Sequence, residues 1–205
     1  MAGAPDQPDD RPTLFTVGHS TRSLDELVEL LEAHDVEAVA DVRAIPKSRR
    51  HPHFHHESLA VELPRRGIAY LPFITLGGRR RSAGPSINTG WRHASFQAYA
   101  DYMQTPEFRA ALAELMAEAL QRPTATMCSE AVPWRCHRRL ISDALLVRGW
   151  RVLDIMSPTK ASEHKLTPFA RVQGLEVTYP DPEGPALFEG QPVSPPDSSP
   201  GSRSA

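Results

Sequence analysis

The 205-residue chain has only two cysteines and no long apolar segment. Two cysteines cannot form the framework of a disulfide-rich secreted domain, so we expect both thiols to be reduced. No run approaches the roughly 18 apolar residues of a membrane span. The N-terminal stretch MAGAPDQPDDRP lacks the apolar core of a secretory signal. These absences predict a cytoplasmic protein that does not interact with membranes.

The chain also lacks the standard motifs of phosphate-binding and redox proteins. Neither G-x-x-x-x-G-K-[ST] nor G-x-G-x-x-G occurs, which excludes the two common nucleotide-binding loops. The C-x-x-C pair of thioredoxin-like proteins is absent. A cysteine-phosphatase loop needs a shorter spacing than the six residues that separate Cys128 from Arg135. The chemistry of this protein must therefore depend on another arrangement.

The composition is that of an ordinary globular domain, with 40% hydrophobic and 23% charged residues. The net charge is -2, but the basic residues gather between Asp41 and Arg92, where ten face only three acidic residues. The ten are Arg43, Lys47, Arg49, Arg50, Arg65, Arg66, Arg79, Arg80, Arg81 and Arg92. This concentration indicates either a surface for an anionic ligand or an ordinary solvated face.

Composition divides the chain into three parts. Residues 1–12 are polar and rich in Pro and Asp, which predicts a disordered leader. Residues 13–182 carry the apolar patterns and form a single predicted α/β domain. Residues 183–205 are rich in Pro and Ser and are expected to form a disordered tail.

Short apolar runs alternate with amphipathic segments through the predicted domain. Strands are expected at residues 14–17, 36–42, 68–71, 124–127 and 151–156. Helices are expected after the capping box Ser23–Glu26, at 57–66, from 95, and at 107–121 and 136–148. This order predicts a three-layer α/β sandwich with a mostly parallel, Rossmann-like sheet of about five strands.

Polar residues follow three of the predicted strands at the point where each strand ends. His19 and Ser20 follow the first strand, Asp41 ends the second, and Cys128 closes the fourth. In open α/β sheets, ligands bind beyond the carboxyl ends of the strands, which meet at one edge. The sequence therefore predicts a single site at this edge.

The segment from Cys128 to Arg138 holds the most informative cluster. Cys136 is predicted to open a helix, and a thiol there, close to arginines, has a lowered pKa. The helix amides and nearby arginines also suit an anion. Glu130 is a candidate general base or an ion-pair partner of an arginine such as Arg43. The alternative is that both thiols only pack in the core.

The histidines between His51 and His56 invite a metal interpretation, but Pro52 interrupts any helical face that they could share. A zinc site at Cys128, Cys136 and His137 has a wider cysteine spacing than usual. We therefore predict no metal and no cofactor. A metal-binding or redox-sensing domain that uses the two cysteines stays open as an alternative.

The ordered motifs together resemble the domain-of-unknown-function family 488 (DUF488), from about residue 13 to 180. The resemblance implies a compact α/β domain of bacterial cytoplasmic proteins and gives no established activity. The family's characteristic positions correspond to His19, Ser20, Asp41, Arg43, Pro46, Arg49, Gly77, Gly78, Cys128, Glu130, Cys136, His137 and Arg138.

Our first functional hypothesis is a pocket, catalytic or enzyme-like, for a phosphate-bearing small molecule, nucleotide or nucleic acid. The expected catalytic residues are His19, Cys128, Glu130, Cys136 and His137. The expected ligand-binding residues are Ser20, Asp41, Arg43, Arg49, Gly77, Gly78 and Arg138. The second hypothesis is a nucleic-acid-binding accessory protein without catalysis. The pattern does not predict protein partners.

Overall fold

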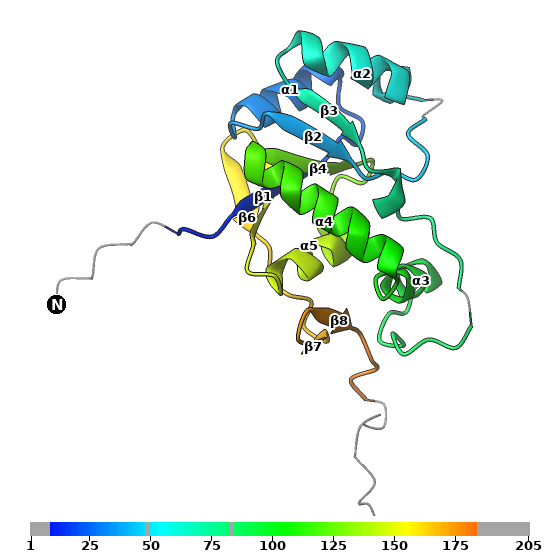
Figure 1. The fold of residues 1–205 in the computed structure, drawn as a ribbon. Coiled ribbons are helices and arrows are strands. Elements are labelled where there is room, and N and C mark those ends of the chain that lie inside the picture. Colours follow the sequence, from blue (N-terminus) through cyan, green and yellow to red (C-terminus); the bar gives the residue numbers. More distant parts are fainter. Residues whose placement is uncertain (1–8, 48–49, 83, 184–205) are drawn as a thin grey trace, which may run out of the picture.

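A six-stranded sheet in the order β3-β2-β4-β1-β5-β6 forms the centre of the molecule (Figure 1). Its strands are β1 (Thr13–Gly18), β2 (Ala38–Asp41), β3 (Ala69–Pro72), β4 (Thr124–Cys128), β5 (Arg151–Ser157) and β6 (Lys160–Glu163). The first five pair in parallel, and β6 pairs antiparallel with β5. This confirms the predicted mostly parallel, Rossmann-like sheet and adds an antiparallel edge strand.

The computed structural model describes residues 9–47, 50–82 and 84–183. Arg49 and most of the expected leader and tail lie outside the described residues, so the expectations for them stay predictions. A small antiparallel pair, β7 (Arg171–Gln173) and β8 (Glu176–Thr178), follows the sheet. The sequence did not indicate this pair, because its strands are three residues long and largely exposed.

Helices cover both faces of the sheet, as the predicted three-layer sandwich requires (Figure 1). One face carries α1 (Leu24–Glu32) and α2 (His56–Arg65), and the other carries α3 (Ala94–Tyr102), α4 (Pro106–Gln121) and α5 (Arg138–Leu146). Strand alternation separates the two cores: Leu14 points into one and Val17 into the other. No helix in the described part of the chain has the length and apolar character to cross a membrane.

The capping box predicted at the start of α1 is present. Ser23 Oγ accepts a hydrogen bond from the Glu26 amide at 3.1 Å, and Glu26 accepts one from the Ser23 amide at 2.6 Å. Both bonds satisfy amides that the helix itself leaves unpaired. This cap fixes where the chain turns from β1 into the first helix.

The helix expected at 136–148 begins two residues later than predicted. Pro133 opens the short 3-10 turn η3 (Pro133–Arg135), and the Cys136 amide donates to the Pro133 carbonyl at 3.0 Å. Because this turn uses the Cys136 amide, α5 starts only at Arg138. Cys136 therefore lies before the helix rather than in its first turn.

The two central strands, β1 and β4, continue toward opposite faces of the sheet. β1 leads to α1 on one face, whereas β4 leads to α5 on the other. Neighbouring strands that diverge in this way open a crevice at their carboxyl ends, where α/β proteins bind ligands. The topology thus places a crevice between the exits of β1 and β4.

Candidate functional site

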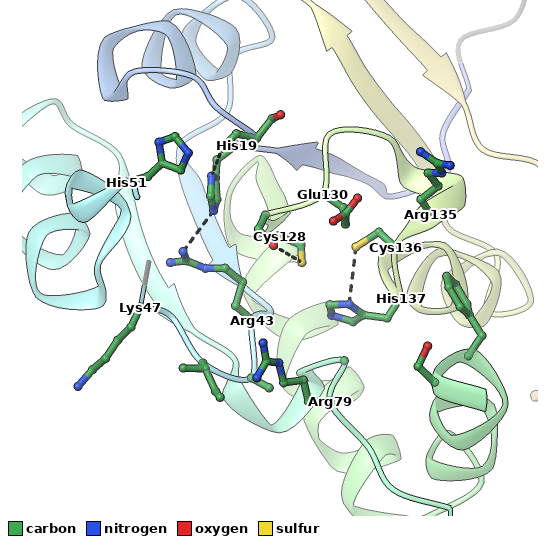
Figure 2. Close-up of a pocket in the computed structure, with 17 residues that line it drawn as sticks. His19, Arg43, Lys47, His51, Arg79, Cys128, Glu130, Arg135, Cys136 and His137 are labelled. Atoms are coloured by element: carbon green, nitrogen blue, oxygen red, sulfur yellow. Dashed lines mark hydrogen bonds between the residues drawn. The ribbon is translucent and has the colours of Figure 1, made fainter. Parts of the chain in front are cut away.

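A cavity of about 410 Å³ lies at this edge of the sheet, where β1, β2 and β4 end (Figure 2). It is lined by His19, Ser20, Arg43, Ala44, Ile45, Lys47, His51, Gly78, Arg79, Ser95, Phe96, Cys128, Ser129, Glu130, Arg135, Cys136 and His137. Eight of the residues predicted from the sequence are therefore brought together: His19, Ser20, Arg43, Gly78, Cys128, Glu130, Cys136 and His137. Asp41, Gly77 and Arg138 do not line the cavity.

The chain segments that leave β1 and β4 are held together by backbone hydrogen bonds. The His19 amide donates to the Cys128 carbonyl at 2.9 Å, and the Ser20 amide donates to the Ser129 carbonyl at 3.0 Å. A Cβ at Gly18 would lie 1.9 Å from the Glu130 carbonyl oxygen. Only glycine permits this approach, which sets the position of His19 relative to the thiols.

We expect Gly18→Ala to destabilise the fold by about 1–3 kcal/mol, because the added methyl group must displace backbone that has no free space. Urea unfolding measures the loss. Gly67→Ala is a suitable reference: its φ is +78° but nothing lies within 4 Å, so it reports backbone strain alone, about 1 kcal/mol. A Gly18→Ala protein that unfolds at the wild-type urea concentration would contradict the predicted close approach.

Arg43 is held by a buried acid at the end of β2. Its Nε and Nη2 donate to the two oxygens of Asp41 at 2.8 and 2.5 Å, and both side chains are nearly inaccessible. Tyr70 Oη also donates to Asp41, at 2.7 Å. The ion-pair partner of Arg43 is therefore Asp41, which corrects the alternative that assigned this role to Glu130. Asp41 orients the guanidinium from behind and does not face the cavity.

His19 is buried next to this guanidinium. Its ring stacks on Phe54, with centroids 4.0 Å apart, and its Nε2 lies 3.3 Å from Arg43 Nη1. Burial and the positive charge of Arg43 lower the pKa of His19 to about 4. The neutral ring then donates from Nδ1 to the Ser20 carbonyl at 3.0 Å and accepts from Arg43 at Nε2. His19 thus orients Arg43 as a neutral ring, and its single N–H is bonded to the Ser20 carbonyl.

Cys128 and Cys136 lie next to each other on the cavity wall, and neither forms a disulfide bond. The neighbouring Cys128 thiol favours a charge on Cys136, and although burial opposes it, Arg138 adds its positive charge and an N–H donor, Nε, 3.4 Å from Cys136 Sγ. Together these interactions lower the pKa of Cys136 to about 6. Interaction with the Cys136 sulfur and burial raise the pKa of Cys128 to about 12. Of the two thiols, Cys136 is therefore the one whose thiolate form is favoured.

His137 completes the group around the thiols. Its Nε2 donates to the Val42 carbonyl at 2.8 Å, which leaves Nδ1 facing Cys136 Sγ at 3.6 Å (Figure 2). A Cβ at Gly78 would lie 2.4 Å from this Nδ1, so the glycine permits the ring to sit where it does. Gly77 has a similar role against Ala44, where a Cβ would come within 2.5 Å of backbone.

The same three side chains have the geometry to hold a metal ion. The ligand atoms of Cys128, Cys136 and His137 all lie within 4.8 Å of one another, and within the described ranges no other group of three does so. Two sulfurs and an imidazole nitrogen suit zinc, and a carbonyl on the far ring nitrogen is the usual second partner of a ligating histidine. In the histidine-rich stretch, His53 instead bonds to the Arg22 carbonyl and His56 to the Tyr70 hydroxyl.

Arg138 supports the site from within the core. Its side chain is 1% exposed and reaches Thr16, the Glu130 carbonyl at 2.7 Å, and Cys136 Sγ at 3.4 Å. The sequence predicts that Arg138 binds the ligand. In the structure it stabilises the thiolate and fixes the loop after β4, and it does not line the cavity.

The cavity is more cationic than the expected site residues indicated. Lys47, Arg79 and Arg135 line it together with Arg43, against a single carboxylate, Glu130. Asp41 neutralises Arg43. Lys47, Arg79 and Arg135 occur in none of the ion pairs found between the described residues. Their spacing in the sequence shows no pattern, and only the fold brings them together.

The basic stretch from 43 to 92 does not form one surface. Arg65 and Arg66 pair with Glu62 along α2. Arg80 lies over the ring of Tyr102, 3.6 Å from its centroid. Only part of the predicted basic cluster therefore reaches the cavity.

These features define an α/β domain with a two-cysteine, one-histidine cluster at the carboxyl edge of a parallel sheet. Residues 23–145 match the family described as "Domain of unknown function DUF488", and the chain belongs to this family. The match runs from α1 through most of α5 and so includes both cysteines. Comparison with curated proteins finds no match, and comparison with solved structures finds none.

Proposed function

We propose that this protein is a thiol-dependent enzyme that acts on a phosphate-bearing ligand. The observation that carries the proposal is the position of Cys136, whose sulfur lies 3.4 Å from Arg138 Nε on the wall of a cavity that has four cationic side chains and one carboxylate. A stabilised thiolate is a nucleophile, and an excess of positive charge favours an anionic substrate. Packing alone requires neither of these features.

Each residue has a role that follows from its contacts. Cys136 supplies the sulfur nucleophile, and Cys128 and Arg138 stabilise its negative charge. The cavity cations Arg79 and Arg43 bind the phosphate, the latter oriented by its buried partner. The exposed carboxylate of Glu130 lies at the same cavity and is available for proton transfer.

The chemical step forms a bond between Cys136 Sγ and an electrophilic atom of the ligand. The sulfur supplies the electron pair of the new bond, and the leaving group departs with the electrons of the bond that breaks. His137 Nδ1, 3.6 Å from the sulfur, is placed to exchange a proton with it as the thiolate forms or is released.

We expect phosphate-bearing compounds to protect Cys136 from alkylation, because they occupy the cavity next to it. Protection by inorganic phosphate or a phosphate monoester is measured as a lower alkylation rate. Arg79→Ala should weaken protection about tenfold and should also reduce its dependence on salt. Arg171→Ala, an exposed substitution on β7, is the matched control and should leave protection unchanged. If no phosphate compound slows alkylation, the ligand class is wrong.

The cluster of three ligand atoms favours a second candidate, a metal centre at Cys128, Cys136 and His137. Metal analysis of protein purified without chelator separates the two candidates. One bound zinc per chain that resists dialysis would support the metal centre and remove the free thiolate. The accessory nucleic-acid-binding function predicts salt-dependent binding that survives replacement of both cysteines.

A further inference from the structure

A second hollow opens beside the cavity, and its lining is aromatic. This groove, of about 680 Å³, contains Trp91, Phe96, Trp134 and Phe169. It shares Ser95, Phe96, Glu130 and Arg135 with the cavity, so the two spaces adjoin. A ligand that occupies the cavity can therefore extend into the groove.

Trp134 is the most unusual residue of the groove. It is 57% exposed and is the only aromatic residue among the strongly exposed large hydrophobic residues of the described chain. It lies on η3, the turn between Glu130 and Cys136, where Pro133 is buried and the Cys136 amide bonds to the Pro133 carbonyl. The exposed indole thus stands on a turn that ends at Cys136. Exposed aromatic rings bind flat ligands by stacking.

The wall that includes Trp91 is rigid. The Trp91 ring stacks on Phe96 with centroids 4.8 Å apart, and Phe169 meets it edge-on at 4.9 Å. The Arg139 guanidinium lies 5.5 Å from the Trp91 ring centroid. These contacts fix the side chains before any ligand arrives, so binding there loses little conformational freedom.

The charged residues of the groove also suit a flat ligand that carries a phosphate. Arg135 lies at the junction with the cavity, and Arg92 lines the groove itself. Glu130 also lies at the junction and can accept hydrogen bonds from amino groups. A flat ring with polar edges, attached to a phosphate, matches this combination of rings and charges.

We infer that the groove is a subsite for the base of a nucleotide unit, whose base stacks at Trp134 while its phosphate occupies the cationic cavity. This inference rests on the proposed function and narrows the ligand class from phosphate compounds to nucleotides. The unit is either a free nucleotide or an unpaired residue of a nucleic-acid strand, because a base inside a duplex cannot stack on a side chain.

Three small probes test the subsite: adenosine 5′-monophosphate, ribose 5-phosphate and adenosine. The nucleotide should bind about tenfold more tightly than ribose 5-phosphate and should quench tryptophan fluorescence. Trp134→Ala should remove this advantage and leave ribose 5-phosphate binding unchanged, whereas Trp134→Phe should retain most of it. Leu120→Ala, which removes an exposed apolar side chain on α4, is the control.

The outcomes distinguish the subsite from the proposed function. Equal binding of nucleotide and ribose 5-phosphate, unaffected by Trp134→Ala, would overturn the subsite while the phosphate-binding function stands. Quenching by adenosine without any protection of Cys136 by phosphate compounds would support the subsite and overturn the proposed function. If the subsite is supported, a short single-stranded oligonucleotide can be compared with adenosine 5′-monophosphate as a competitor for binding. Tighter binding of the oligonucleotide would show that the ligand is an unpaired residue of a nucleic-acid strand.

Discussion

Iodoacetamide at pH 7 is expected to alkylate Cys136 in the folded protein and to leave Cys128 unmodified. The pKa of Cys136 is about 6, so this residue is largely thiolate at pH 7, whereas the pKa of Cys128 is about 12. The alkylation rate should rise with pH to a plateau above about pH 7 and exceed that of a free thiol at pH 6.5 by about tenfold. Mass spectrometry of the native protein identifies the labelled residue.

Two variants separate the causes of this reactivity. Cys136→Ser should abolish the fast reaction. Cys128→Ala removes the neighbouring thiol that favours a charge on Cys136, so the pH midpoint of alkylation should move upward toward the ordinary thiol value. Native protein in which neither cysteine reacts until it unfolds would contradict the proposed nucleophile, and the segment would then have only a packing and anion-binding role.

The layers and most elements of the fold could be predicted because their signals are local. The Ser23–Glu26 capping box, the proline at the first position of α4 and the apolar run that becomes β4 each specify structure within a few residues. The sequence does not indicate the antiparallel edge strand β6, because three of its four residues are polar and all four are at least partly exposed. Its pairing with β5 depends on tertiary contacts, and a strand of four residues is too short to show a periodic hydrophobic pattern.

The site could be predicted in part, because the carboxyl ends of parallel strands must meet. This rule placed His19 and Cys128 together before any contact was known. It could not show that Arg138 points into the core, since the side-chain direction depends on where α5 begins. The rule also does not predict that Arg79, on a long loop, and Phe96, on α3, line the cavity. Residues on such connections are placed by tertiary packing alone.

A second buried polar network, centred on Asp143 of α5, was not anticipated from the sequence. Asp143 is fully buried and accepts hydrogen bonds from His164 at 2.9 Å, from the Thr167 amide and hydroxyl at 3.1 and 2.6 Å, and from Tyr179 at 2.8 Å. One carboxylate thus attaches the chain after β6 and the chain after β8 to α5. Burial opposes a charge on His164, but its bonds to Asp143 and Asp154 raise the pKa to about 9.

Asp143→Asn is expected to lower the free energy of unfolding by about 3–5 kcal/mol at pH 6. The amide cannot balance the buried charge of His164 and donates where the carboxylate only accepts. Denaturant unfolding at pH 6 measures the loss. Glu114→Gln, which makes the same chemical change on the exposed side of α4, should change stability by less than about 0.5 kcal/mol.

The dependence on pH tests whether the charge of His164 is the cause. Its pKa is about 9 in the folded protein and about 6.5 when unfolded, so the folded state binds the proton more tightly. The stabilisation is complete below about pH 6.5 and is lost as the pH rises through about 9, a decrease of about 3 kcal/mol. Asp143→Asn should remove most of this decrease, so the variant and the wild type should differ less at pH 9.5 than at pH 6. An equal difference at both pH values would show that Asp143 acts through hydrogen bonding to Thr167 and Tyr179, without a charged His164.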